Sequence, residues 1–263
     1  MTEGNPQIEL INVDVTGAEL RADTVMVQNV TWTINEGDYW VVGGLPGTGK
    51  TDLLATAAGL QKPAAGTHLV FGRDFYRLDE VEQLRERLRV GLVFQNGGRL
   101  FGSQTILENL VLPICYHRDC TLEEARPHAQ EILKLTELTG MERRRPHRLN
   151  RSLHQRVALA RALMLTPEVL LIDNPLGGVD AREAFWWLDF LPRLAAGVPQ
   201  LSNRKMTLVV TTDDFRPWRK QGNHFALVDS KKWSIIGGPD ELEKSSDPVV
   251  REVLAPSYSR KEI

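Results

Sequence analysis

The chain has 263 residues, of which 42% are hydrophobic and 25% are charged, as in an ordinary globular protein near the upper size for one hydrophobic core. Its 32 basic and 34 acidic residues leave a net charge of −2, which gives no electrostatic argument for nucleic acid as the main partner. The sequence contains no apolar stretch of the ~18 residues that cross a bilayer, and its start lacks the pattern of a signal peptide. We therefore expect a cytoplasmic protein.

The first third predicts a mixture of strands and helices. Apolar and polar residues alternate over 8–34, which predicts an antiparallel sheet. The apolar run at 39–42 predicts a buried strand, and a helix is expected directly after it at 52–58. A short strand follows at 68–72. Residues 79–88 carry mixed charges with apolar residues at helical spacing, so we expect an amphipathic helix there.

Two further apolar strands each end at a polar residue. The strand at 89–94 ends at Gln95, and the strand at 169–172 ends at Asp173. In a parallel sheet such ends meet the ligand crevice, and a carboxylate there suits Mg²⁺. We therefore expect Gln95 and Asp173 to belong to a binding site.

The segment between these strands shows only helical periodicity, over about 100–163. Thr121 with Glu124 forms a capping-box sequence at the start of one helix, and another helix is expected at about 151–163. The last third predicts, in order, a helix around 185–191, a strand at 207–210, a β-pair at 225–236 and a helix at 249–254. A polar tail follows at about 255–263.

A phosphate-binding loop lies between the strand at 39–42 and the helix after it. The pattern is two glycines separated by four residues and followed by Lys and Thr. Glycines let backbone N–H groups turn toward an anion, and the helix N-terminus adds its dipole. Lys50 would meet the β- and γ-phosphates and Thr51 would reach Mg²⁺. The nucleotide-binding candidates are Gly44, Leu45, Pro46, Gly47, Thr48, Gly49, Lys50, Thr51 and Asp52.

The order of motifs resembles an ATP-binding cassette (ABC) transporter nucleotide-binding subunit over nearly the whole chain. The phosphate loop corresponds to Walker A, Gln95 to the Q-loop, and residues 155–163 to the body of the signature helix. Asp173 corresponds to the Walker B aspartate and Asp180 to the D-loop. The resemblance implies ATP and Mg²⁺ as cofactors, with Thr51, Gln95 and Asp173 as metal ligands.

A narrower likeness is to the Mla-type lipid-transport ATPases, which work with MlaE-type permeases. Three segments carry it, at 94–101, 108–113 and 246–254. The resemblance implies a membrane permease as partner, a second nucleotide-binding subunit, and a place on the inner face of the membrane. Residues near Leu100 and Phe101 would receive a helix of the permease, although they are equally explained as ordinary core.

The chain departs from the family pattern at its signature. The family sequence Leu-Ser-Gly-Gly-Gln corresponds to Leu149 through Leu153, where only the leucine matches. Side chains at Arg151 and Ser152 replace the two glycines and could obstruct the γ-phosphate of the opposite subunit. Asn150 remains a good N-cap, and Arg151 offers a phosphate contact of its own.

Two positions that serve catalysis in the family also differ. Asn174 stands in place of the glutamate that polarises the attacking water, and an amide cannot accept a proton at neutral pH. Thr212 stands in place of the switch histidine. No aromatic residue lies near residues 15–20, where the family usually stacks adenine.

A basic run, Arg143–Arg145 with Arg148 and Arg151, remains outside these motifs. A solvated or phosphate-facing helix start explains it more simply than DNA binding.

We therefore expect an α/β fold: a P-loop NTPase core with a mostly parallel sheet, an N-terminal antiparallel β-subdomain and an inserted helical subdomain at about 97–165. The whole chain, 1–263, would form one nucleotide-binding domain. Its function would be to power or gate lipid or organic-solute transport, with impaired hydrolysis. The alternatives are a non-hydrolysing ATP-binding regulatory subunit of a membrane complex and a soluble P-loop enzyme such as a small-molecule kinase.

Overall fold

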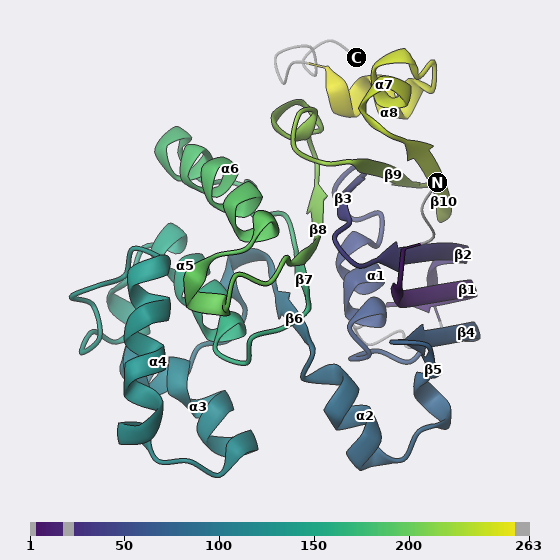
Figure 1. Cartoon of the computed structure of the whole chain (residues 1–263). Helices are drawn as coiled ribbons and strands as arrows, with labels where there is room; N and C mark the ends of the chain where they lie inside the picture. The colour runs from purple at the N-terminus through teal and green to yellow at the C-terminus, as the bar shows by residue number, and fades with distance from the viewer. Residues whose placement is uncertain (1–3, 18–23, 256–263) are drawn as a thin grey trace. The chain divides into compact units, whose positions relative to one another are not determined.

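The computed structural model describes residues 4–17 and 24–255, and their elements are shown in Figure 1. They cluster into two compact units. The first takes in the described residues up to Glu86 and those from Thr207 onward, and the second is Arg87–Met206. The predicted tail lies outside the described residues from position 256 onward, as do positions 18–20 of the stretch where the family stacks adenine.

The first unit is built on a sheet with the strand order β5-β4-β1-β2-β10-β9-β3-β8. Its strands are β1 (Pro6–Thr16), β2 (Val25–Asn35), β3 (Tyr39–Gly43), β4 (Ala65–Val70), β5 (Arg73–Asp74), β8 (Thr207–Thr212), β9 (His224–Asp229) and β10 (Lys232–Gly237). Its helices are α1 (Lys50–Ala57), α2 (Glu80–Arg87), α7 (Pro239–Lys244) and α8 (Pro248–Leu254), with 3-10 turns η1 (Phe75–Arg77) and η5 (Arg216–Trp218).

The antiparallel part of this sheet is the one that the alternating sequence predicts. β1 pairs antiparallel with β2 and with β4, so the prediction is confirmed for the described residues within 8–34. Along β2 the buried residues Val30, Trp32 and Ile34 alternate with exposed ones, because successive side chains of a strand point to opposite faces.

The parallel strands at the centre of the sheet are the most buried ones. β3 lies between β8 and β9 and pairs parallel with both. Every residue of β3 and β8 is buried, as expected for strands covered on both faces. The pairing places Gly43, the last residue of β3, beside Thr212, the last residue of β8, so the carboxyl ends of the two strands lie side by side.

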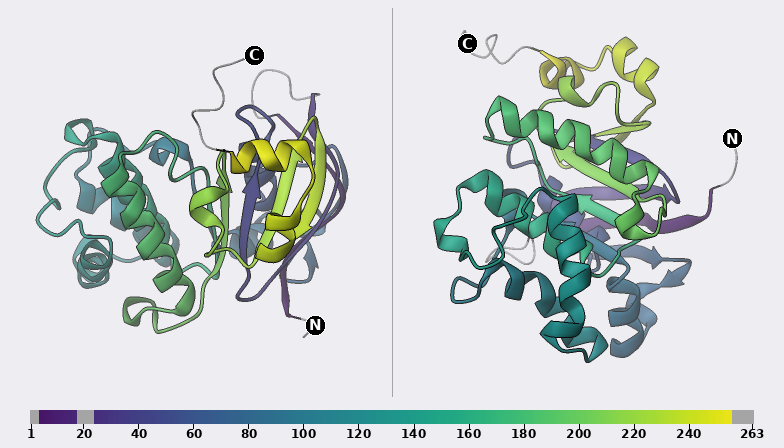
Figure 2. Two further views of the ribbon diagram at one scale, coloured as in Figure 1. Left: turned by 90° about the horizontal axis from the view of Figure 1, so that it is seen from above. Right: turned by 60° about the vertical axis from the view of Figure 1, so that its left-hand side comes forward.

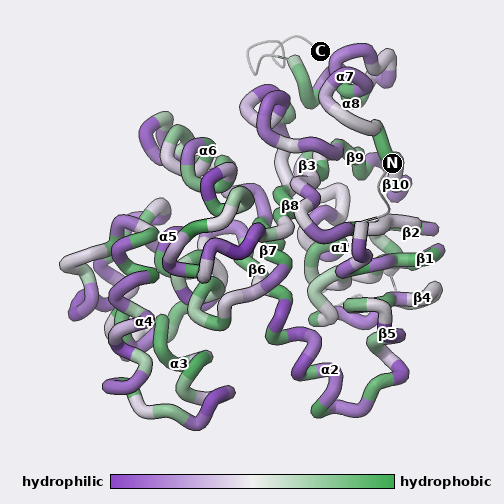
Figure 3. The backbone as a smooth tube through the Cα atoms, in the orientation of Figure 1, coloured by the Kyte–Doolittle hydropathy of each residue, from purple (hydrophilic) through white to green (hydrophobic). Residues whose placement is uncertain are grey.

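Helix α2 forms where an amphipathic helix is predicted, but its apolar residues do not form a buried face. Val81 is 68% exposed and Leu84 is 38% exposed. The helix is mainly hydrophilic along its length (Figure 3), and its one buried residue is Glu86. The Arg73 guanidinium donates to Glu86 at 3.2 Å and also pairs with Glu82. An ion-pair network therefore holds this helix against β5.

The second unit has two parallel strands, β6 (Val90–Val93) and β7 (Val169–Ile172). Its helices are α3 (Ile106–Arg118), α4 (Leu122–Leu135), α5 (Arg151–Leu163) and α6 (Ala181–Ala196), with 3-10 turns η2 (Gln95–Gly97), η3 (Pro146–Arg148) and η4 (Pro199–Leu201). Helix α3 packs against α4 and α5, which two further views also show (Figure 2).

The helix boundaries of this unit follow from their caps. The predicted capping box of Thr121 with Glu124 opens α4, and an unpredicted one, Thr105 with Glu108, opens α3. The segment 100–163 contains helices and turns with no strand, as predicted. Within the described ranges, no helix has the length and apolar character needed to span a membrane.

Candidate functional site

The phosphate loop occupies the turn between β3 and α1 in the first unit. Strand β3 ends at Gly43, and α1 begins at Lys50 with Gly49 as its N-cap. The first turn of a helix presents backbone N–H groups that have no acceptor within the helix. These N–H donors and the positive end of the helix dipole therefore face the space before the N-terminus of α1, where they would stabilise a bound anion.

Two glycines of the loop are required by its geometry. Gly49 has a φ of 99°, a conformation that L side chains rarely adopt, and an added Cβ would lie 3.0 Å from Met26 Cβ. At Gly44 an added Cβ would lie 2.4 Å from the carbonyl oxygen of Val228. The loop thus depends on close backbone approach, as a phosphate cradle does.

Lys50 is held over the loop by acceptors of its own unit. Its Nζ donates to the carbonyl oxygens of Gly44 at 2.6 Å and Leu45 at 2.9 Å. It also forms an ion pair with Asp213 Oδ1 at 2.9 Å. The Lys50 side chain is 7% exposed and that of Asp213 is 32% exposed. A carboxylate therefore already pairs with the amine that a nucleotide's phosphates would need.

The Thr212 hydroxyl is occupied inside the first unit. Thr212 is 2% exposed, and its Oγ1 accepts from the Trp218 indole at 3.1 Å. The same oxygen accepts from the backbone N–H of Asp214 at 3.1 Å and donates to its carbonyl oxygen at 2.9 Å. Since this saturates the hydroxyl, Thr212 has no free group for sensing a γ-phosphate.

The polar residues that end β6 and β7 lie together in the second unit. Val93 pairs with Ile172, and the Asp173 backbone N–H donates to the Val93 carbonyl at 2.8 Å. An added Cβ at Gly177 would lie 2.5 Å from Asn174 Nδ2 and 3.0 Å from Gln95 Nε2. The side chains of Asn174 and Gln95 therefore converge on Gly177.

The donor set suits a hard divalent cation. Mg²⁺ prefers oxygen ligands and is usually held by one or two carboxylates together with the substrate's phosphates. Asp173 supplies a carboxylate that is 4% exposed, Gln95 an amide oxygen, and Thr51 a hydroxyl on the first turn of α1. Among the described residues no group of three or more His, Cys, Asp or Glu is placed to hold a metal. Each unit thus supplies oxygen donors of the kind that Mg²⁺ prefers, Thr51 in the first unit and Gln95 and Asp173 in the second.

The degenerate signature sits at the start of α5. Asn150 caps the helix, with its side chain accepting from the Leu153 N–H at 2.9 Å, so the predicted N-cap is confirmed. Arg151 Nη2 donates to the Gly177 carbonyl at 2.7 Å. The guanidinium thus bonds a backbone oxygen of its own unit. Asp180 caps α6 by accepting from the Glu183 N–H at 2.9 Å.

Sequence reasoning missed two residues of this region. One is Asp213, which follows Thr212 directly. An acidic pair, Asp213-Asp214, directly after an apolar strand is the sequence pattern that indicates a polar site at the end of that strand. Gly177, on which Asn174 and Gln95 converge, gave no signal beyond being a glycine.

The comparisons with known sequences agree on one family. The family model described as ABC transporter matches residues 27–177. The chain is 32% identical over 231 residues to the sulfate/thiosulfate import ATP-binding protein CysA of Synechococcus elongatus, covering 88% of this chain and 63% of that protein. It is 28% identical over 254 residues to the probable ribonucleotide transport ATP-binding protein mkl of Mycobacterium bovis, covering 96% of this chain and 68% of that protein. The chain thus spans about two thirds of these relatives' lengths.

Solved structures similar to the chain show the same fold. The dimeric structure of MJ0796, a bacterial ABC transporter cassette, superposes with a TM-score of 0.75 at 30% identity, covering 86% of this chain and 96% of that one. The cbiO1 structure from Clostridium perfringens has a TM-score of 0.75 at 20% identity, covering 95% and 94%, and supports the fold. The predicted fold class is confirmed. Because the family match extends over more than half of the sequence, the chain belongs to the ABC transporter family and carries its ATP-binding domain.

Proposed function

We propose that this chain binds Mg-ATP and serves as the nucleotide-binding subunit of a membrane transporter. The observation that carries the proposal is the phosphate loop, in which buried β3 delivers Lys50 to the start of α1 over a tight glycine turn. Thr51 is the metal ligand that we propose in the first unit, and Asp173 and Gln95 are those that we propose in the second. The chain would work as a dimer on the cytoplasmic face of the membrane, and the dimeric MJ0796 structure supports the pairing.

A non-hydrolysing ATP-binding subunit is the second candidate. It is favoured by Asn174, an amide at the position of the general base, and by Thr212, whose hydroxyl is saturated within its own unit. Such a subunit would change shape on binding ATP with little turnover. Steady-state hydrolysis separates the two candidates.

Lipid is the cargo that we propose. Its support is the resemblance of segments 94–101, 108–113 and 246–254 to the Mla-type ATPases, which implies an MlaE-type permease. The names of the relatives mention sulfate, ribonucleotides and methionine, so they do not single out one cargo.

The permease would dock at the loop after Gln95. Phe101 is 52% exposed there, which favours the surface interpretation over the core one. Asn109, fully buried in α3, holds the loop by accepting from the Phe101 N–H at 2.8 Å and donating to its carbonyl at 3.1 Å. An exposed aromatic on an anchored backbone is a suitable contact for an apolar partner helix.

We expect Phe101→Asp to abolish co-purification with an integral membrane protein from native membranes. The reason is that a charge would then face the apolar docking surface. The matched control is Tyr116→Asp, because Tyr116 is a 78% exposed aromatic of the same unit. Pull-down with quantitative mass spectrometry measures the loss. Failure of the wild-type chain to retain any multi-span membrane protein would contradict the transporter proposal.

We expect Asp213→Asn to raise ATP affinity about tenfold, because ATP then no longer competes with a carboxylate for Lys50. A hydrogen bond to a charged group contributes about 1.5–3 kcal/mol, and the partial exposure of Asp213 favours the lower end. Calorimetric titration with Mg-ATP measures the change. In a Lys50→Ala background the Asp213 effect should disappear. A gain of equal size in that background would mean that Asp213 acts by repelling phosphates directly.

A further inference from the structure

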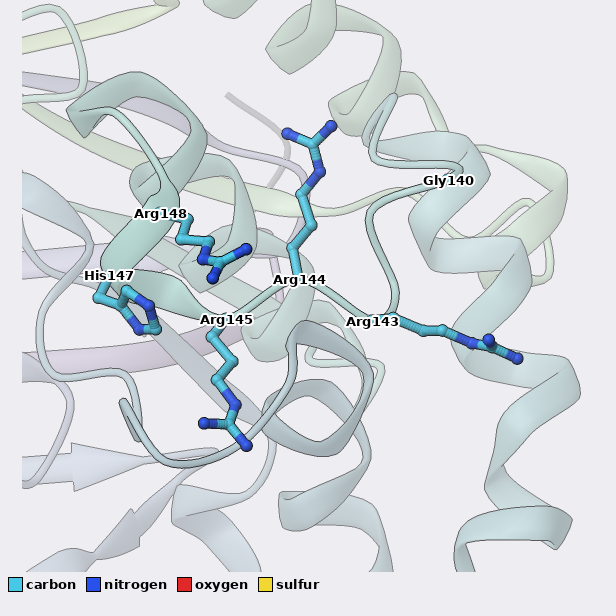
Figure 4. A pocket seen from close by; sticks show the side chains of 6 residues that line it. All are labelled: Gly140, Arg143, Arg144, Arg145, His147 and Arg148. Atoms are coloured by element: carbon cyan, nitrogen blue, oxygen red, sulfur yellow. The ribbon is translucent and has the colours of Figure 1, made fainter.

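The second unit carries a basic loop that the nucleotide site does not use. We define the basic loop as residues 140–148, between α4 and α5. Four of its arginines, together with Gly140 and His147, line a cavity of about 400 Å³ (Figure 4). The arginines are Arg143, Arg144, Arg145 and Arg148, and all four are exposed. Within the described part of the chain, no acidic side chain lines this cavity.

The backbone of the basic loop is anchored. The first two N–H groups of α3 donate to it, Ile106 to the Arg144 carbonyl at 2.8 Å and Leu107 to the Glu142 carbonyl at 3.0 Å. Pro146 is buried at the start of η3. The backbone that carries the four arginines is therefore held in place, while their side chains extend into solvent.

The four arginines of this loop outnumber its one carboxylate, Glu142, whose Oε1 accepts from the Gly140 N–H at 3.0 Å. Among the residues that the structure describes, Arg143, Arg144 and Arg148 have no ion pair and no side-chain hydrogen bond. Arg145 differs, because together with hydrogen bonds from the Thr105 N–H and hydroxyl it lowers the pKa of Glu108. Clustering like charges costs free energy unless an anion balances them, and the net charge of the whole chain is only −2.

We propose that the basic loop is a binding site for a ligand carrying two or more phosphate groups. Arginine's planar fork matches phosphate oxygens, and one phosphate group accepts several such bonds. Figure 4 shows the guanidinium groups of Arg144, Arg145 and Arg148 extending in different directions, so separate phosphates would meet separate arginines. The cavity has the size of a small-ligand pocket, and the side chains that line it are cationic residues and one histidine.

The phosphates would come either from a free polyphosphate or from the headgroups of an anionic bilayer, and two assays distinguish these sources. The first titrates inorganic tripolyphosphate into the full chain with Lys50→Ala, which weakens the competing nucleotide loop. The second measures co-sedimentation with vesicles of phosphatidylglycerol and phosphatidylcholine against vesicles of phosphatidylcholine alone. The test variant is Arg143→Gln with Arg144→Gln and Arg148→Gln.

The control variant removes three exposed cations elsewhere, Arg85→Gln with Arg182→Gln and Lys244→Gln, and so changes the net charge equally. We expect the test variant to weaken binding in at least one assay by about tenfold and the control by less than about twofold. Equal loss in both variants, or no loss in either assay, would overturn the proposal. If a polyglutamate peptide bound as tightly as tripolyphosphate, and the test variant lost that binding, the proposed preference for phosphate would be overturned. The site does not depend on ATP binding, so its test stands apart from that of the proposed function.

Discussion

Hydrolysis of ATP by the wild-type chain is expected to be about 10²–10⁴ times slower than in a cassette with a catalytic carboxylate, which is the usual cost of losing a general base. Asn174 can orient water but cannot take its proton. In the family's head-to-tail dimer each site draws the base and switch from one subunit and the signature from the other. All three departures occur in this one chain, so we expect that pairing with an intact subunit would leave each site defective.

The structure decides which reversion to test first. Asn174→Glu restores a carboxylate next to Gln95 and Gly177, and we expect it to raise turnover, with Asn174→Gln as the uncharged control. Thr212→His would displace a buried hydroxyl that satisfies the Trp218 indole and Asp214, so it should lower thermal stability. A coupled ATPase assay measures turnover. A wild-type rate of roughly 1–10³ s⁻¹ that is lost in Lys50→Ala would contradict the expectation.

Elements with strong local signals could be predicted closely from the sequence. The helix at Arg151–Leu163 has the predicted bounds because Asn150 caps it. The strand at Val169–Ile172 has the predicted bounds because its sequence is an unbroken apolar run. Helix α7 was missed, since six mostly charged residues show no apolar periodicity. In α2 the spacing of three apolar residues predicted the helix correctly. It did not predict which face packs against the sheet, because the ion pair of Arg73 with Glu86 determines that face.

The candidate site was predictable where a motif is contiguous and unpredictable where distant segments meet. The phosphate loop is a single stretch of sequence. The contact of Lys50 with Asp213 instead follows from the register of β3 with β8, which places Gly43 beside Thr212 and so brings Asp213 to the loop. The pairing of β6 with β7 likewise sets Gln95 near Asn174. No local pattern encodes either register.

Loss of Mg-ATP binding by at least about 100-fold is expected for Lys50→Ala. Lys50 would give two charge-assisted hydrogen bonds to the β- and γ-phosphates, which at the low end contribute about 3 kcal/mol together. Folding should persist, because water can replace the amine at the partly exposed Asp213 and at the loop carbonyls that Lys50 contacts.

Calorimetry with Mg-ATP measures the loss, and thermal melts confirm that the variant is folded. The matched control is Lys62→Ala, which removes an exposed lysine of the same unit whose Nζ lies 5.8 Å from the centroid of the Tyr76 ring. We expect this control to bind as the wild type does, because its charge lies outside the loop. If Lys50→Ala held nucleotide as tightly as Lys62→Ala, the turn between β3 and α1 would not be the phosphate site.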